Sequence, residues 1–303
     1  MRKISMRDAF GEAMLELGRQ NNKVLALTAD LGASVRLNKF AQEFPERFIN
    51  FGVAEANMIG AAAGLASEGF IPYTTSFAVF TPGRCFDHIR VSVCQNKANV
   101  KIVGSHAGFS NPGDGATAQS VEDIALARVL PEMTVICPAD ANQVKKAVFA
   151  MSEQEGPVYL RISRAETPVF TKEEDGFEIG KAQILRKDGK VTIIACGSLG
   201  YEALQAAEEV DGEVINLHTI KPLDKETILK SVQKTGRVIT IEEHSVYGGM
   251  GSAVAEFLVQ EYPVPMKILG IQDFFGESAR DYQQLLDKHE LNAESIVKAV
   301  KEL

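Results

Sequence analysis

The sequence contains no tryptophan, few cysteines and no long apolar run among its 303 residues. Its longest apolar stretches, at 59–66 and 191–196, fall far short of the roughly 20 residues that a membrane-spanning helix needs. The N-terminal segment also lacks the apolar core of a signal peptide. The sequence therefore predicts a cytoplasmic protein with no membrane partner.

The cysteines and histidines follow no pattern that indicates a metal or redox site. No two cysteines have the spacing of a zinc knuckle or a CxxC pair, and no HExxH motif occurs. We therefore expect buried, reduced thiols and no metal ligands in this chain. His244, which follows two glutamates, is expected to have a capping or domain-interface role. The four cysteines are Cys85, Cys94, Cys137 and Cys196.

The charge of the chain excludes some partners. It carries a net charge of −8, with both signs scattered along the sequence. This distribution argues against a surface that binds nucleic acid or an anionic membrane. Small anionic substrates remain compatible with it, because a few local arginines can bind a phosphate inside an acidic protein.

Short apolar, β-rich runs alternate with helix-like segments in two blocks. Such alternation indicates parallel sheets that helices cover on both faces. The predicted strands lie at 24–28, 48–51, 71–76, 100–104, 133–137, 158–162, 191–196, 213–217, 238–243 and 266–271. The predicted helices lie at 5–20, 34–44, 54–68, 84–96, 119–129, 141–152, 200–210, 224–234 and 250–261.

The fold class that follows is α/β, with two doubly wound sheets. Residues 1–168 are predicted to form the larger domain around a parallel sheet. Residues 191–303 are predicted to form a smaller domain with a mostly parallel sheet. The charged segment 169–190, with its two Asp-Gly turns, is interpreted as a linker that contains at most one hairpin.

Glu55 is the first candidate for chemistry, because it stands alone in an Ala/Gly-rich segment that is predicted to be a buried helix. A glutamate in a first helical turn often only complements the helix dipole. A carboxylic acid that stays protonated can instead donate to a ring nitrogen, as some cofactor chemistry requires. The residues alone leave both interpretations open.

The Gly-rich loop 104–120 and the arginines around it are the second candidate. Loops of this length inside a compact domain are usually functional or disordered, and this one carries His106 and Asp114. A strand-end histidine and a simple turn at Asp114 are the alternative. Arg7, Arg161 and Arg164 form a further set. Arg7 precedes the first predicted helix and Arg164 follows the last strand of the first domain, so both could point at the same edge of the sheet. Two arginines there would suit a phosphate, although single arginines are mostly surface groups.

At this point several motifs together resemble a known family. In order, ADLGAS, FINFGVAEANMIGAAAGLA, TSFAVFTPGR, VGSHAGFSNPGDGA, CPADANQ and YLRISRAE resemble the pyrimidine-binding domain of transketolases. The block from VTIIACGSLG to IEEHSVYGGMGSAV resembles their C-terminal domain, so the resemblance covers essentially the whole chain. Deoxyxylulose-5-phosphate synthases and the E1 β subunits of 2-oxoacid dehydrogenases share the layout, but the SRAE and PADANQ details favour transketolase.

The resemblance implies a transferase of the pentose phosphate pathway that uses thiamine diphosphate. It would move a two-carbon ketol unit from a ketose phosphate to an aldose phosphate. Full-length transketolases have an additional N-terminal domain that binds the diphosphate and the metal. The resemblance therefore implies a split enzyme, active only with an N-terminal-section subunit that supplies most ligands of Mg²⁺ or Ca²⁺. The expected assembly resembles an α2β2 heterotetramer.

The resemblance also assigns roles to individual residues. Glu55 would be the catalytic group that hydrogen-bonds N1′ of the aminopyrimidine. Phe77 and Phe80 would form the aromatic pocket around that ring, and Asp30 would lie near the cofactor at the dimer interface. The substrate-binding residues would be Arg7, Ser34, His106, Asp114 and Arg164.

One position departs from the family pattern. After GDGAT, sugar transketolases commonly have a histidine that contacts the donor, and this chain has Ala118. Loss of a hydrogen-bonding group can change donor choice, so the exact ketose donor and aldose acceptor stay open.

A subunit with the activity of a deoxyxylulose-5-phosphate synthase or a 2-oxoacid dehydrogenase is one alternative. A non-catalytic regulatory subunit is another, and it predicts that Glu55→Gln changes nothing measurable. The sequence also leaves open the identity of the partner chain, the stability of this chain alone as a dimer, and the role of the C-terminal domain.

Overall fold

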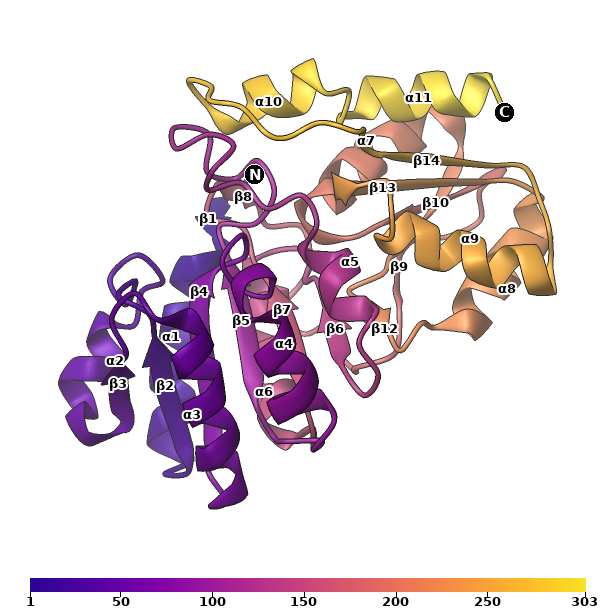
Figure 1. The fold of residues 1–303 in the computed structure, drawn as a ribbon. Coiled ribbons are helices and arrows are strands. Elements are labelled where there is room, and N and C mark those ends of the chain that lie inside the picture. The colour runs from indigo at the N-terminus through magenta and orange to yellow at the C-terminus, as the bar shows by residue number, and fades with distance from the viewer.

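The computed structural model describes residues 1–303, which build two large sheets with helices on both faces and one small two-stranded sheet (Figure 1). The first sheet has the strand order β12-β6-β7-β5-β4-β2-β3 and is parallel except for its edge strand β12. Its strands are nearly continuous apolar runs, as expected when helices cover both faces. They are β2 (Val24–Thr28), β3 (Phe48–Asn50), β4 (Ile71–Phe77), β5 (Lys101–Ser105), β6 (Thr134–Ile136), β7 (Val158–Arg161) and β12 (Thr219–Lys221).

Alternate side chains of these strands enter different cores. Val24 and Ala26 pack with α1 (Met6–Gln20) and α6 (Ala141–Glu153) on one face. Leu25 and Leu27 pack with the helices of the other face. The remaining helical segments of this half are α2 (Asn38–Glu43), η1 (Pro45–Arg47), α3 (Glu55–Ser67), η2 (Gly83–Cys85), α4 (Phe86–His88), the π-helix η3 (Ile89–Cys94) and α5 (Asp123–Arg128).

The second sheet has the order β14-β13-β10-β11-β9, and only β9 runs antiparallel to its neighbour. Helices α7, α10 and α11 lie on one side of this sheet and α8 and α9 on the other (Figure 1). Its strands are β9 (Gln183–Arg186), β10 (Val191–Ala195), β11 (Gly212–Asn216), β13 (Val238–Ser245) and β14 (Met266–Ile271). Its helices are η4 (Gly197–Leu199), α7 (Gly200–Val210), α8 (Lys225–Thr235), α9 (Met250–Glu261), α10 (Tyr282–Lys288) and α11 (Ala293–Lys301).

The two sheets share a hydrophobic core. One cluster of buried side chains contains Leu27 and Met58 from the first half of the chain together with Ile228 and Val254 from the second. Strand β12 also leaves the second half to pair with β6 of the first sheet. The two halves of the chain therefore pack against each other through an apolar interface.

The predicted fold class is confirmed, and the elements that were missed pair with distant partners. The segment 167–190 contains no hairpin. Instead β8 (Glu166–Pro168) pairs with β1 (Lys3–Ser5), and β9 joins the second sheet beside β11. The two C-terminal helices were also not predicted. All four cysteines are buried and free, as expected, and no helix combines the length and apolar character that crossing a bilayer requires.

Candidate active site

The candidate residues of the first domain gather at the carboxyl edge of its sheet, where open α/β sheets bind ligands. Strands β7, β5, β4, β2 and β3 are neighbours in that order. Along the edge lie Arg164 after β7, His106 after β5, Phe77 at the end of β4, Asp30 after β2 and Glu55 after β3. Residues as far apart in the sequence as Asp30 and Arg164 thus line one edge.

A cluster of arginines lies at one end of this row. The Nη1 of Arg7 donates to the backbone oxygen of Ser34 at 3.0 Å. Burial lowers the pKa of Arg7, and the nearby charges of Arg36 and Arg164 lower it further. The Nε of Arg7 is buried and has no hydrogen-bond partner. A concentrated positive charge with an unused donor suits a tetrahedral oxyanion such as a phosphate.

Arg36 belongs to this cluster although the sequence analysis did not select it. Its backbone lies in the left-handed region, with φ of 66°, and its Nε donates to Asp8 Oδ1 at 2.5 Å. Non-glycine residues in this conformation often occur at functional sites. No local pattern distinguishes Arg36 from any other surface arginine, so only the folded chain reveals its position.

His106 lies beside the arginines and contributes hydrogen bonding rather than charge. It is 2% exposed. Burial, together with the charges of Arg7 and Arg164, lowers its pKa to about 3. Its Nδ1 lies 2.9 Å from the Oγ of Ser105. The imidazole is therefore neutral at physiological pH.

Asn111, also missed by the sequence analysis, connects Asp114 to the arginine cluster. Its Oδ1 accepts from Arg164 Nη1 at 2.6 Å, and its Nδ2 donates to Asp114 Oδ2 at 2.6 Å. The Asp114 side chain is at the surface, whereas Ala118 is only 8% exposed. The backbone N–H of Ala118 donates to Gly115 O at 3.0 Å. Asn111 thus links Asp114 to the arginine cluster, and Ala118 lies in the same loop.

Glu55 lies at the other end of the row, where Arg84 links it to a pair of phenylalanines. It is the first residue of α3 and is 6% exposed. Arg84 Nη1 donates to Glu55 Oε1 at 3.1 Å, and the Arg84 guanidinium lies 4.2 Å from the centroid of the Phe80 ring. Phe80 stacks on Phe77 with ring centroids 5.8 Å apart, and Phe77 stacks on His106 with ring centroids 3.8 Å apart. The Phe77–His106 stack therefore connects the part of the site that contains Glu55 with the arginine cluster.

Asp30 and Arg161 are the remaining candidates near this edge. Asp30 has a positive φ of 61°, and its backbone N–H donates to Asn50 Oδ1 at 2.9 Å. Arg161, which the sequence grouped with Arg7 and Arg164, does not join them. It is buried and pairs with Asp123 at 2.9 Å. The structure has no group of three or more His, Cys, Asp or Glu side chains that could hold a metal ion.

Comparisons with known proteins agree with this architecture. Residues 2–169 match the transketolase pyrimidine binding domain, and residues 180–296 match the transketolase C-terminal domain. The chain is 44% identical over 304 residues to a 6-deoxy-6-sulfo-D-fructose transketolase subunit of Clostridium sp. (strain MSTE9), covering 98% of this chain and 94% of that protein. It is 39% identical over 276 residues to an apulose-4-phosphate transketolase subunit of Phocaeicola vulgatus, covering 89% of this chain and 88% of that protein.

Among solved structures, the chain is similar to a split gene transketolase described as an inactive beta4 tetramer. The TM-score is 0.89 at 45% identity, over 99% of this chain and 97% of that one. The fold is of the α/β class, with two mostly parallel sheets and candidate residues on the carboxyl-edge loops of the larger one. The chain belongs to the transketolase family and corresponds to its pyrimidine-binding and C-terminal domains.

Proposed function

We propose that this chain is the C-terminal subunit of a split transketolase, which transfers a two-carbon ketol unit from a ketose phosphate to an aldose phosphate. The main support is the Phe77–His106 stack at 3.8 Å. It brings a carboxyl group in an aromatic setting next to a cationic cluster. A transketolase needs both, because its cofactor ring and the anionic end of its sugar bind in one continuous site.

The residues around Glu55 fit the aminopyrimidine of thiamine diphosphate, which members of the family normally use. The stacked pair Phe77 and Phe80 offers a flat apolar surface to an aromatic ring. The nearly buried carboxyl of Glu55, which accepts from Arg84 Nη1, would hydrogen-bond the ring nitrogen N1′. When bound, the cofactor would supply the electron sink that carbon–carbon cleavage requires.

The arginine cluster would hold the phosphate of the sugar. Arg7 has an unpaired, buried Nε, and Arg164 is oriented by Asn111. The neutral His106 would donate or accept a hydrogen bond without adding charge. Asp114, the exposed carboxylate of the loop, would orient a hydroxyl of the donor. These contacts would fix the sugar in one orientation, which lowers the entropic part of the barrier.

The donor is expected to be a ketose that carries a tetrahedral oxyanion. The two named relatives have a sulfonated and a phosphorylated sugar in their names, and an arginine cluster can bind either group. Ala118 stands where sugar transketolases commonly have a histidine, so the donor is not restricted to xylulose 5-phosphate.

The partner would be an N-terminal-section subunit that supplies the sites for diphosphate and metal, in an α2β2 assembly. Both named relatives are subunits, and the similar split-gene structure is described as an inactive tetramer of β chains. These names support a chain that is inactive alone.

The test is to mix the chain with a co-expressed N-terminal-section subunit, thiamine diphosphate and Mg²⁺. Ketol transfer from xylulose 5-phosphate to ribose 5-phosphate is then measured, with each subunit alone as a control. We expect activity only in the mixture. A complex that binds the cofactor but transfers no ketol unit would refute the standard substrates, and other ketose phosphates and then pyruvate would be assayed.

A matched pair of variants separates a catalytic subunit from a regulatory one. Glu55→Gln should lower the rate of the mixture about 100-fold or more, which is within the range for loss of an acid–base group. Glu68→Gln, at the exposed C-terminal end of the same helix, should have the wild-type rate. A wild-type rate in both variants would support the non-catalytic alternative.

A further inference from the structure

The second half of the chain holds the 106–120 loop by hydrogen bonds along its length. The Phe109 N–H donates to Glu243 Oε1 at 2.5 Å. The Ala279 N–H donates to Pro112 O at 2.9 Å, and Gln119 Nε2 donates to the backbone oxygen of Glu277 at 3.0 Å. Contacts from the second half of the chain therefore contribute to the conformation of this loop, beside those from its own domain.

The 106–120 loop and the second half of the chain also pack closely against each other. Gly108 has a φ of 60°, and a Cβ added to it would lie 2.5 Å from Glu243 Oε1. Gly115 has a φ of 72°, and its added Cβ would overlap the Oγ of Ser278. The buried ring of Phe109 packs on His289, with ring centroids 4.9 Å apart. The glycines therefore allow the second domain to contact the loop backbone directly.

Glu243 is the central contact and is itself held firmly. It is 4% exposed, and its Oε2 accepts from the Tyr282 hydroxyl at 2.6 Å. The charged groups that face it are Arg161 and Asp123, and burial raises its pKa to about 7.

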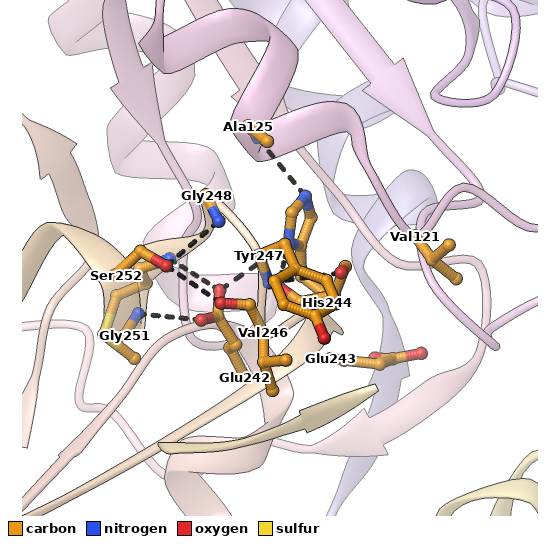
Figure 2. Close-up of polar contacts among 12 residues, drawn as sticks. Val121, Ala125, Glu242, Glu243, His244, Val246, Tyr247, Gly248, Gly251 and Ser252 are labelled. Carbon is orange, nitrogen blue, oxygen red and sulfur yellow. Dashed lines mark hydrogen bonds and ion pairs between the residues drawn. The ribbon is translucent and has the colours of Figure 1, made fainter. Parts of the chain in front are cut away.

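The neighbours of Glu243 on β13 are fixed as well. Glu242 accepts the backbone N–H groups of Met250 and Gly251 at 2.6 and 2.7 Å. His244 accepts from the N–H of Ala125 of the first domain at 3.3 Å (Figure 2). The end of β13 is thus anchored on both sides, and Glu243 projects from a rigid support.

The same loop carries three groups of the candidate site, namely His106, Asn111 and Asp114. We propose that the C-terminal domain shapes this loop for donor binding, with Glu243 as the positioning residue that fixes Phe109. This inference rests on the proposed function, and it gives the C-terminal domain a role in substrate recognition. Glu243 acts through the loop backbone and does not touch the sugar.

Hydrogen exchange on the chain alone tests the positioning without any activity. Glu243→Ala should accelerate exchange in peptides covering 106–115 about tenfold, because a charged hydrogen bond to the backbone is lost. Glu243→Gln should restore slow exchange, since its amide oxygen still accepts from Phe109. As a control, Arg128→Ala removes domain contacts to Gly248 and Glu256 that lie away from the loop, and should leave the loop peptides unchanged.

The assembled enzyme supplies the second readout. Glu243→Ala should raise the KM for the ketose donor about tenfold, with kcat within about twofold of wild type, and Glu243→Gln should recover the wild-type KM. If Glu243→Ala does not fold, Tyr282→Phe removes the hydrogen bond to Glu243 Oε2, together with a 3.1 Å contact to Ser198 Oγ, and keeps the carboxylate. It should give a smaller change in the same direction.

Three results would overturn the proposal. They are unchanged loop exchange in folded Glu243→Ala, an equal acceleration in Arg128→Ala, and a fall in kcat with no change in donor KM. If the wild-type mixture transfers no ketol unit while the exchange results hold, the proposed function fails separately, and Glu243 remains a residue that positions the loop.

Discussion

His244 provides a pH-dependent measure of how the two halves of the chain dock. Its Nδ1 lies 2.8 Å from the backbone oxygen of Ser245, and its Nε2 lies 3.3 Å from the backbone nitrogen of Ala125. Together these contacts require the neutral ring with its proton on Nδ1. A second proton on Nε2 would face the N–H of Ala125, so protonation is incompatible with this contact. Figure 2 shows the ring between the end of β13 and α5.

The size of the effect follows from the pKa of His244. Burial lowers that pKa to about 4, below the value of about 6.5 in an unfolded chain. The unfolded state therefore binds more protons between these two values, and the stability contribution is present above pH 6.5 and lost as the pH falls. Between pH 8 and pH 5 the loss from this one group is about 2 kcal/mol.

The perturbation is His244→Gln, whose amide oxygen can still accept from Ala125 but does not titrate. The free energy of unfolding is measured with urea at pH 8 and at pH 5. From pH 8 to pH 5 it should fall by about 2 kcal/mol more in wild type than in this variant. Wild type is compared with His244→Gln because other groups also titrate in this range: burial raises the pKa of Glu242 and of Glu243 to about 7. Those groups destabilise the fold as the pH rises, which is the opposite sign, and they are present in both proteins.

A control variant makes the experiment specific. His88 is exposed on α4, so His88→Gln should keep the wild-type difference between the two pH values. The same pH dependence in wild type and His244→Gln would refute the assignment of a neutral, buried His244 to this interface.

Three further predictions concern the site and the fold. Arg164→Ala should raise the donor KM about ten- to hundredfold in the assembled enzyme, because one or more charge-assisted hydrogen bonds are lost; Arg19→Ala, which breaks an exposed ion pair, should not. Ala118→His should shift the ratio of kcat/KM values about tenfold toward xylulose 5-phosphate against other ketose phosphates, and an unchanged ratio would separate this position from donor choice. Gly104→Ala should destabilise the chain by about 2 kcal/mol or more in urea unfolding, because its Cβ would overlap a buried tyrosine of the adjacent strand. Gly64→Ala, in open space on α3, should stabilise the chain by about 0.5–1 kcal/mol, so a loss in both variants would point to a general intolerance of the added methyl group.

The regular elements could be predicted because their signals are local. The apolar run of β10 and the Ala/Gly-rich sequence of α3 each indicate their structure without knowledge of the rest of the chain. Strands β9 and β12 gave no such signal. Each pairs as an antiparallel edge strand with a partner at least 25 positions away, and a short edge strand need not carry a continuous apolar pattern.

The candidate site divides in the same way. His106, Asp114 and Glu55 could be selected because each follows a predicted strand or begins a predicted helix, and the family resemblance added their roles. Arg36 and Asn111 could not, because nothing near them in the sequence shows what they contact. The roles of these residues remain predictions, and the Glu55→Gln variant tests that of Glu55 directly.

The sequence by itself determined the α/β class, the position of most strands and helices, and the loops in which chemistry could occur. These properties depend on periodicity and on turn residues, which act over a few positions. Only the tertiary structure decided which charges meet and which loop the second domain contacts. The pairing of β1 with β8 brings Arg7 and Arg164 together, and the packing of two sheets on one core brings Glu243 to Phe109. Such contacts are set by the sum of many long-range interactions, so no local segment encodes them alone.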